Sequence, residues 1–203
     1  MELYKVDIDD TTDLTPVLLP EIYLQKMNVM LKDIINFLNE NEIEYWADGG
    51  TLLGAYREKG QIKYDDDNDF GMDTKNYFKL IKLIPLLKEK GYDVQEQKDD
   101  VIKIVDNNNM YSRKMETENN GLFEIARACC IDVFLYVEKK NEYHLSHKSN
   151  RLKFPNCIYK KEDLYPLKQY KYDDLFISGA NNPEQFLSDY YGDWTKKSVY
   201  MYL

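Results

Sequence analysis

The sequence contains little of what builds disulfide-bonded, zinc-binding or membrane-spanning proteins. It has 203 residues and only 3 cysteines. Cys129 and Cys130 are adjacent and Cys157 is isolated, so no Cys-x-x-Cys pair or zinc-type spacing exists, and we expect buried, reduced thiols. No run of about 18 apolar residues occurs, so we expect no membrane span. The first ten residues have neither a basic region nor an apolar core, so we expect no signal peptide and a cytoplasmic location.

Positive charge is also scarce. Lys and Arg number 27 against 36 Asp and Glu, which gives a formal net charge of -9. Attraction of a whole protein to nucleic acid or to an anionic membrane needs a positive field, so we expect neither partner. A chain this acidic that handles a phosphorylated substrate would need a metal cation as mediator. The apolar share of 43% is that of a globular protein, which excludes general disorder.

The pattern of apolar residues predicts helices and strands without regular alternation. Spacings of three and four predict helices over 20–41, 74–90 and 183–191, the last with Asn182 as its cap, and Thr51 caps a short helix through Arg57. Strands are predicted over 43–47, 64–73, 92–97, 101–106, 129–137 and 170–178. We therefore predict an α+β fold with a small mixed β-sheet flanked by helices.

The remaining segments predict one domain with an N-terminal arm. Residues 1–19 are expected to be an irregular arm, and residues 20–203 to form a single domain. Within that domain, residues 107–121 predict a loop or weak strand, and residues 138–163 a polar, lysine-rich excursion. The segment 129–137 is the most apolar strand, so we expect it at the centre of the sheet.

An acidic run stands out at residues 64–73, YDDDNDFGMD. On a strand, Asp65, Asp67 and Asp69 would share one face, with about 7 Å between neighbours. That spacing suits carboxylates that hold one hard cation, or a pair. An ordinary solvated acidic loop is the alternative. A calcium-binding EF-hand is excluded, because Phe70 and Asn76 stand where its Gly and Glu are required.

Three further features favour a phosphate and metal site. Gly49 and Gly50 precede the short helix of Thr51, where glycines let backbone N–H groups approach a phosphate. Arg57, at the end of that helix, would supply a positive charge, or else pair with a surface acid. Asp132 lies inside an apolar strand, which is costly unless the acid is paired or metal-bound. It would complete a triad with Asp67 and Asp69, or be held as a buried acid by other donors.

The segment GGTLLGAYREKGQIKYDDDNDFGMD, residues 49–73, resembles the signature of the LicD family. The resemblance continues at 101–104, 131–134 and 165–167, and ends in a Tyr-Gly-Asp-Trp box at 191–194, so it covers about 20–195. One departure is visible, since Lys63 and Tyr64 replace the Pro-Trp that usually precedes the acids.

The resemblance implies a nucleotidyltransferase fold and the transfer of a phospho-alcohol, such as phosphocholine or ribitol phosphate. The donor would be CDP-linked, the acceptor a glycan hydroxyl, the product CMP and the cofactor Mg²⁺ or Mn²⁺. Asp67 and Asp69, with Asp65 nearby, match the metal ligands, and Asp132 matches the third acid, a ligand or general base. The catalytic residues would be Asp132, Asp67 and Asp69. The residues Gly49, Gly50, Thr51 and Arg57 match the donor-binding turn and its basic residue.

Three alternatives remain open at this point. A nucleotidyltransferase would release pyrophosphate, and a metal-dependent glycosyltransferase would release CDP. The glycosyltransferase usually needs a doubly wound nucleotide domain before its acids, and only one helix and one strand precede them here. A non-catalytic copy of the fold that binds nucleotide or glycan is the third alternative.

Overall fold

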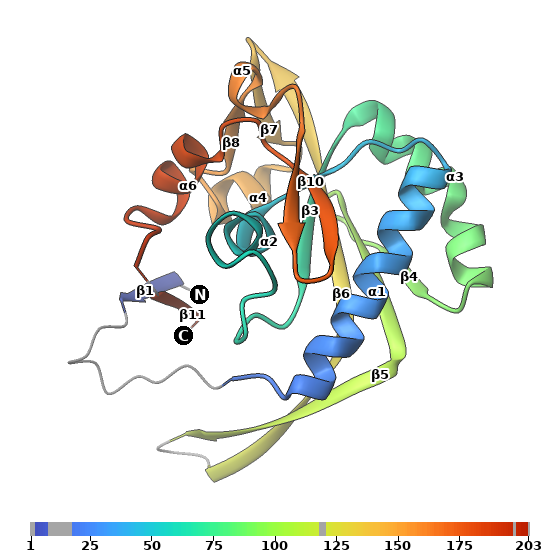
Figure 1. Ribbon diagram of the computed structural model, residues 1–203, viewed down its shortest axis with the longest axis vertical. Helices are drawn as coiled ribbons and strands as arrows, with labels where there is room; N and C mark the ends of the chain where they lie inside the picture. Colours follow the sequence, from blue (N-terminus) through green and yellow to red (C-terminus); the bar gives the residue numbers. More distant parts are fainter. Residues whose placement is uncertain (1–2, 8–17, 118–120, 197, 203) are drawn as a thin grey trace.

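The computed structural model describes residues 3–7, 18–117, 121–196 and 198–202. Its main sheet has seven strands: β2 Trp46–Ala47, β3 Asn68–Asp73, β4 Asp93–Glu96, β5 Val101–Thr117, β6 Gly121–Lys139, β7 Glu142–Leu145 and β8 Ile158–Lys160. The strand order is β2-β3-β6-β5-β4, and β7 and β8 continue from the end of β6 (Figure 1). Only β3 and β6 are parallel, and all other neighbours are antiparallel. The sheet is therefore mixed, as predicted.

Strand β6 is the centre of this sheet. It pairs with β3 on one side, with β5 on the other and with β7 at its end. Its residues Ile131 and Val133, which point to the same face of the strand, are 1% and 0% exposed. The prediction of a central strand over 129–137 is confirmed.

Helices cover the sheet, and they follow the predicted periodicity. Helix α1 Glu21–Glu40 starts directly after Pro20, and α3 Thr74–Glu89 starts after Asp73, whose side chain accepts a hydrogen bond from Asn76 N–H. Figure 1 shows α1 and α3 to the right of the long β6 ribbon, and the other helices to its left. The latter are the short α2 Gly49–Leu53, α4 Lys148–Lys153, α5 Lys161–Leu164 and α6 Pro183–Tyr191. Helix α6 has Asn182 at its N-cap position, but without a side-chain cap bond.

The structure corrects or refines four expectations about local structure. The strand over 64–73 begins only at Asn68, because Asp is a poor strand former and adjacent like charges repel. Of the two alternatives left open over 107–121, loop or weak strand, residues 107–117 form strand, because their backbone pairs with the first half of β6 after a bulge between Asp106 and Met110. The polar excursion expected over 138–163 contains the end of β6, all of β7, α4 and β8, and the first residues of α5. Residues 3–7 of the expected irregular arm form strand β1, Leu3–Asp7.

Two small sheets complete the architecture. Strands β9 Lys168–Tyr172 and β10 Leu175–Gly179 form a hairpin. A single strand was predicted over 170–178, so this segment holds two strands instead of one. Strand β1 pairs with β11 Ser198–Tyr202, so the two ends of the chain lie together (Figure 1). Within the described ranges, no helix has the length and apolar character needed to span a membrane.

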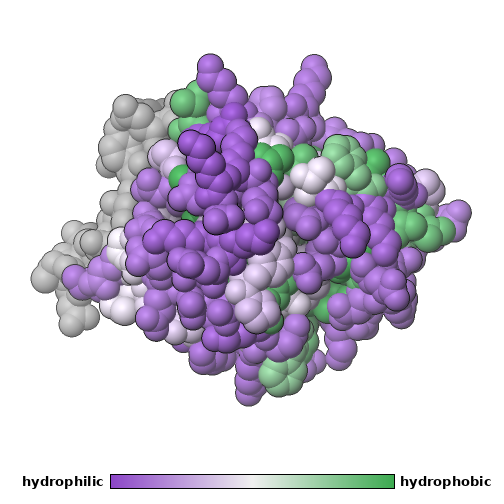
Figure 2. All heavy atoms as spheres, turned by 90° about the horizontal axis from the view of Figure 1, so that it is seen from above, coloured by the Kyte–Doolittle hydropathy of each residue, from purple (hydrophilic) through white to green (hydrophobic). Residues whose placement is uncertain are grey.

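The end of the molecule near α5 and β7 has a mostly hydrophilic surface with scattered hydrophobic side chains (Figure 2). A hollow of about 750 Å³ lies there, and its lining includes Lys140, Lys161 and Tyr165. The acids singled out in the sequence are not part of that lining.

Candidate metal and phosphotransfer site

Five carboxylates gather where the loop before β3 meets the sheet, and we call them the aspartate cluster: Asp65, Asp66, Asp67, Asp69 and Asp132. Ligand atoms of Asp67, Asp69 and Asp132 all lie within 4.8 Å of one another, and so do those of Asp65, Asp66 and Asp67. Asp69 and Asp132 are direct neighbours in the parallel register of β3 and β6. The structure thus brings together the three acids predicted to form a triad.

The face-sharing strand that was predicted for Asp65 and Asp67 does not exist. Both residues lie in the loop that precedes β3, and only Asp69 is on the strand. The loop is held by its backbone: the side-chain amide of Gln61 donates to the carbonyl of Asp65 at 2.9 Å and to that of Asp67 at 3.3 Å. The amide oxygen of Gln61 accepts from Asn68 at 2.7 Å and from the hydroxyl of Tyr172. The hydrogen bonds of the Gln61 side chain, rather than strand pairing, therefore hold the loop in place.

The Gly49–Gly50 turn lies directly against the cluster. A Cβ at Gly49 would sit 2.9 Å from Oδ2 of Asp69, and a Cβ at Gly50 would clash with Oδ2 of Asp65. Gly49 also has a φ of 47°, a left-handed conformation that other residues adopt at a cost. The N–H of Gly49 donates to Asp48. The glycines therefore make room for the acids, and their expected contact with a donor phosphate remains a prediction.

The sequence suggested that Thr51 caps the short helix, but in the structure it does not. The N-cap of α2 is Asp48, whose carboxylate accepts from the N–H of Gly49 at 2.9 Å. The hydroxyl of Thr51 instead accepts a hydrogen bond from the N–H of Asp69 at 2.8 Å, and Thr51 is only 1% exposed. This bond ties the glycine turn to the strand that carries Asp69.

Asp48 is a buried acid that sequence reasoning missed. It is 3% exposed, and its carboxylate accepts hydrogen bonds from the hydroxyls of Tyr136 at 2.6 Å and Tyr159 at 2.7 Å. Burial raises the pKa of Asp48, and the bonds from Tyr136, Tyr159 and Gly49 act in the opposite direction. In the sequence, the one sign of a role for Asp48 was its position directly before two glycines.

Lys103 contacts the cluster from β5, which pairs with the edge of β6 opposite to β3. Its Nζ lies 2.8 Å from Oδ1 of Asp132, and the side chains of the pair are 27% and 17% exposed. Burial raises the pKa of Asp132 above its usual range, and the ammonium of Lys103 opposes that rise. Lys103 lies within residues 101–104 of the family resemblance, which implied no role for it.

The electrostatics of the cluster favour the binding of positive charge. Burial raises the pKa of Asp65 and of Asp69 well above the ordinary carboxyl range, and the charge of Asp67 adds to both rises. The donor set consists of carboxylate oxygens only, which suits a hard cation such as Mg²⁺ or Mn²⁺. The residues present therefore fit a divalent ion at this position.

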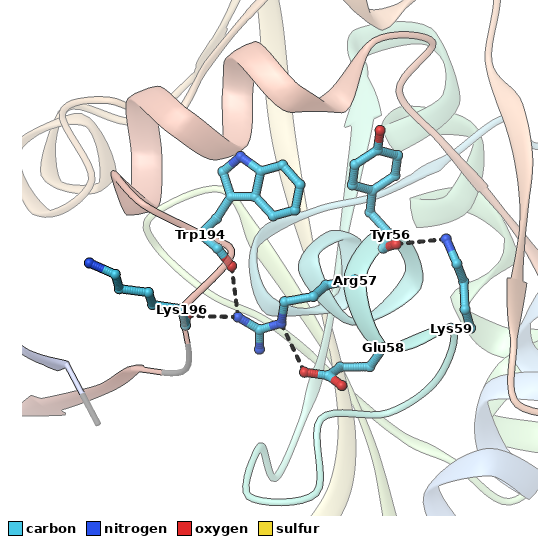
Figure 3. Close-up of polar contacts among 6 residues, drawn as sticks. All are labelled: Tyr56, Arg57, Glu58, Lys59, Trp194 and Lys196. Atoms are coloured by element: carbon cyan, nitrogen blue, oxygen red, sulfur yellow. Dashed lines mark hydrogen bonds and ion pairs between the residues drawn. The ribbon is translucent and has the colours of Figure 1, made fainter. Parts of the chain in front are cut away.

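Arg57 lies in the π-helical turn η1 Gly54–Glu58 that continues α2. Figure 3 shows its guanidinium pointing toward the C-terminal segment. Its Nη1 donates to the carbonyls of Trp194 at 2.9 Å and Lys196 at 3.1 Å, while its Nε donates to Glu58 at 2.8 Å. Arg57 is thus largely committed to other protein groups, and its donor-binding role remains a prediction.

Comparison with known proteins identifies the family. Residues 42–182 match the family model described as LicD/FKTN/FKRP, nucleotidyltransferase domain. The chain belongs to this family. The resemblance found at residues 49–73 is therefore confirmed, together with the nucleotidyltransferase-like α+β fold. The match contains the aspartate cluster and the glycine turn of the LicD/FKTN/FKRP chain.

Curated relatives of this LicD/FKTN/FKRP chain are distant. It is 29% identical over 170 residues to an uncharacterized protein of Rickettsia prowazekii, covering 84% of this chain and 55% of that protein. It is 26% identical over 154 residues to the lipopolysaccharide cholinephosphotransferase LicD of Haemophilus influenzae, covering 68% of this chain and 55% of that protein. The chain spans about half the length of these relatives.

The solved structure of ANT(2″)-Ia in complex with adenylyl-2″-tobramycin is also similar. The TM-score is 0.41 at 12% sequence identity, and the likeness covers 77% of this chain and 69% of the other.

Proposed function

We propose that this chain transfers a phospho-alcohol from a CDP-linked donor to a glycan hydroxyl and releases CMP. The observation that best supports this proposal is that ligand atoms of Asp67, Asp69 and Asp132 lie within 4.8 Å of one another. These residues come from a loop and from two parallel strands. The relative from Haemophilus influenzae is named a cholinephosphotransferase, which makes phosphocholine the first alcohol phosphate to test. Ribitol phosphate is the second, on the family resemblance.

The proposed cofactor is Mg²⁺ or Mn²⁺, held by Asp67 and Asp69, with Asp65 and Asp132 beside them. When bound, such an ion neutralises the charge of a diphosphate. Phosphoryl transfer depends mainly on positioning and charge stabilisation, which is what a cluster fixed by backbone and glycine contacts provides.

The remaining chemistry is assigned to Asp132. The acceptor oxygen attacks the phosphorus of the alcohol phosphate, the bond from that phosphorus to the CMP oxygen breaks, and CMP leaves. The acceptor proton passes to the carboxylate of Asp132, which orients the hydroxyl. Asp132 is suited to this task because burial raises its pKa and so makes it a better base than an exposed carboxylate.

Product analysis tests the proposal. The purified chain is incubated with CDP-choline or CDP-ribitol, Mn²⁺ or Mg²⁺, and either water or a panel of glycans. We expect CMP, and we expect Asp69→Asn to lower its release by roughly 100-fold or more. Asp189→Asn, at an exposed position of α6, is the matched control and should leave release unchanged.

Other products would overturn the proposal. Release of CDP would indicate glycosyl transfer, and release of pyrophosphate would indicate nucleotidyl transfer. Nucleotide binding by calorimetry with no turnover across the acceptor panel would indicate a non-catalytic copy of the fold.

A further inference from the structure

The side chain of Lys103 belongs to the same row as two acids of the aspartate cluster. Lys103 on β5 stands opposite Asp132 on β6, and Asp132 stands opposite Asp69 on β3. Directly opposed residues in a sheet project from the same face, so the three side chains form one row across three strands. We propose that Lys103 is a positioning residue that holds one oxygen of Asp132 and leaves the other for the cation and the acceptor hydroxyl.

The contact geometry supports this division of the carboxylate. Oδ1 of Asp132 is buried and lies 2.8 Å from Nζ of Lys103, in an ion pair that falls short of an aligned hydrogen bond. Because Oδ1 is enclosed, Oδ2 is the oxygen that can accept a new partner. Nζ of Lys103 also lies 3.6 Å from Sγ of Cys130, which precedes Asp132 by two positions on the same strand face. The ammonium is therefore held beside Asp132 from two directions.

The consequence for a bound cation follows from charge. An ammonium in contact with a cation ligand repels the cation, so it lowers affinity while it fixes the direction of the carboxylate. Without Lys103, Asp132 would turn freely and could offer both oxygens to the ion. Lys103 therefore weakens cation binding and orients Asp132 for the reaction. This inference rests on the proposed function for its chemical step, but not for its effect on cation affinity.

A purely structural role predicts a different outcome. If Lys103 only compensates a buried acid, its loss lowers the stability of the fold and also removes the repulsion of the cation, but it leaves the kcat of the folded variant unchanged. Tighter cation binding combined with slower chemistry would not result from such a loss. The two roles are therefore separated by the kcat of the folded variant and by its partial recovery in Lys103→Arg.

The test uses the purified chain and Mn²⁺ alone, by calorimetric titration at pH 8. Lys103→Met removes the charge and keeps the length, and Lys103→Arg keeps a charge. Lys82→Met, at an exposed position of α3, is the control for the loss of one lysine. We expect Lys103→Met to bind Mn²⁺ roughly 3- to 10-fold more tightly. Lys103→Arg and Lys82→Met should stay near the value of the unaltered chain.

The second readout is CMP release from the CDP-linked donor. We expect Lys103→Met to lower kcat by roughly 10- to 100-fold with little change in the KM of the donor, and Lys103→Arg to recover part of it. If Lys103→Met fails to fold, Lys103→Gln replaces it with the same expected increase in Mn²⁺ affinity.

Several results would overturn the inference. Weaker or unchanged Mn²⁺ binding by Lys103→Met would do so, and so would an unchanged kcat in that variant or absence of Mn²⁺ binding by the unaltered chain. If the unaltered chain binds Mn²⁺ but releases no CMP, the proposed function fails, and the titration still decides the effect of Lys103 on the cation.

Discussion

The hydroxyl of Thr51 accepts the backbone N–H of Asp69 at 2.8 Å, across the boundary between α2 and β3. This bond determines where Asp69 stands relative to the glycine turn. Thr51 is only 1% exposed, so its hydroxyl is held inside the protein beside the strand. The helix and the strand that form the site are thus connected by one side chain.

Replacing Thr51 tests this connection. Thr51→Val keeps the shape and removes the acceptor, so it leaves the N–H of Asp69 unsatisfied at a cost of about 1–3 kcal/mol in the free energy of unfolding. Urea denaturation measures the loss, and Mn²⁺ affinity should fall with it. Thr51→Ser restores the hydroxyl and should recover most of both. Equal stability of the Val and Ser variants would show that the bond contributes nothing.

The raised pKa values of Asp65 and Asp69 predict how the metal-free protein responds to pH. Because their folded pKa values lie above the unfolded value, the folded state binds protons more tightly than the unfolded state. The corresponding stability is fully present below the unfolded pKa of about 3.9 and is lost as pH rises through the folded values. At pH 8 in EDTA, Asp65→Asn or Asp69→Asn should therefore raise the melting temperature, by about 2–4 °C.

Metal addition should reverse this order. Mn²⁺ should raise the melting temperature of the unaltered chain and leave that of Asp69→Asn nearly unchanged, because ligand binding to the folded state stabilises it. Differential scanning fluorimetry from pH 5 to pH 8, with EDTA or with Mn²⁺, measures both effects. An Asn variant less stable than the unaltered chain at pH 8 in EDTA would contradict the prediction.

Asp48 should be important for stability. It accepts bonds from Tyr136, Tyr159 and the N–H of Gly49 while almost fully buried. Asp48→Asn replaces one acceptor oxygen by a donor that faces other donors, so we expect a loss of about 1.5–3 kcal/mol. Urea denaturation measures it, and the exposed Asp189→Asn should change stability by less than about 0.5 kcal/mol. A loss as small as that of the control would show that the three bonds are replaceable.

Arg57 should hold the C-terminal segment in place. Its guanidinium donates to the carbonyls of Trp194 and Lys196, and the ring of Trp194 lies 5.5 Å from that of Tyr56. Arg57→Met should therefore speed amide exchange over residues 192–196 by about tenfold, the equivalent of about 1.4 kcal/mol. Hydrogen exchange with mass spectrometry measures it, and α1 should exchange as before. Unchanged exchange in 192–196 would show that the carbonyl bonds do not restrain the segment.

The elements with strong periodicity were predictable, because local pattern decides them. The stripe of α1 and the apolar run of β6 each bury one surface, and both formed where the spacing placed them. The convergence of Asp67, Asp69 and Asp132 was also predicted, because the acids interrupt strands at a cost that only a partner or an ion offsets.

The supporting contacts could not be predicted, since they depend on which residues meet across the fold. The bond of Gln61 to the carbonyls of Asp65 and Asp67 needs Tyr172 from β9 to fix the amide. Likewise, Asp48 acquires its environment from Tyr136 and Tyr159, which are far away in the chain. The same amide network holds the loop in front of Asn68, and no periodicity in the sequence indicates it.

The parallel pairing of β3 with β6 places α3, β4 and β5 between Asp69 and Asp132 along the chain. The triad is therefore non-local, and the chain completes it only after the intervening hairpin has docked. A nascent or truncated chain that ends before β6 carries the acidic loop without its third acid. Full cation affinity would then mark a chain that has finished assembling its sheet, and partly folded molecules would lack it.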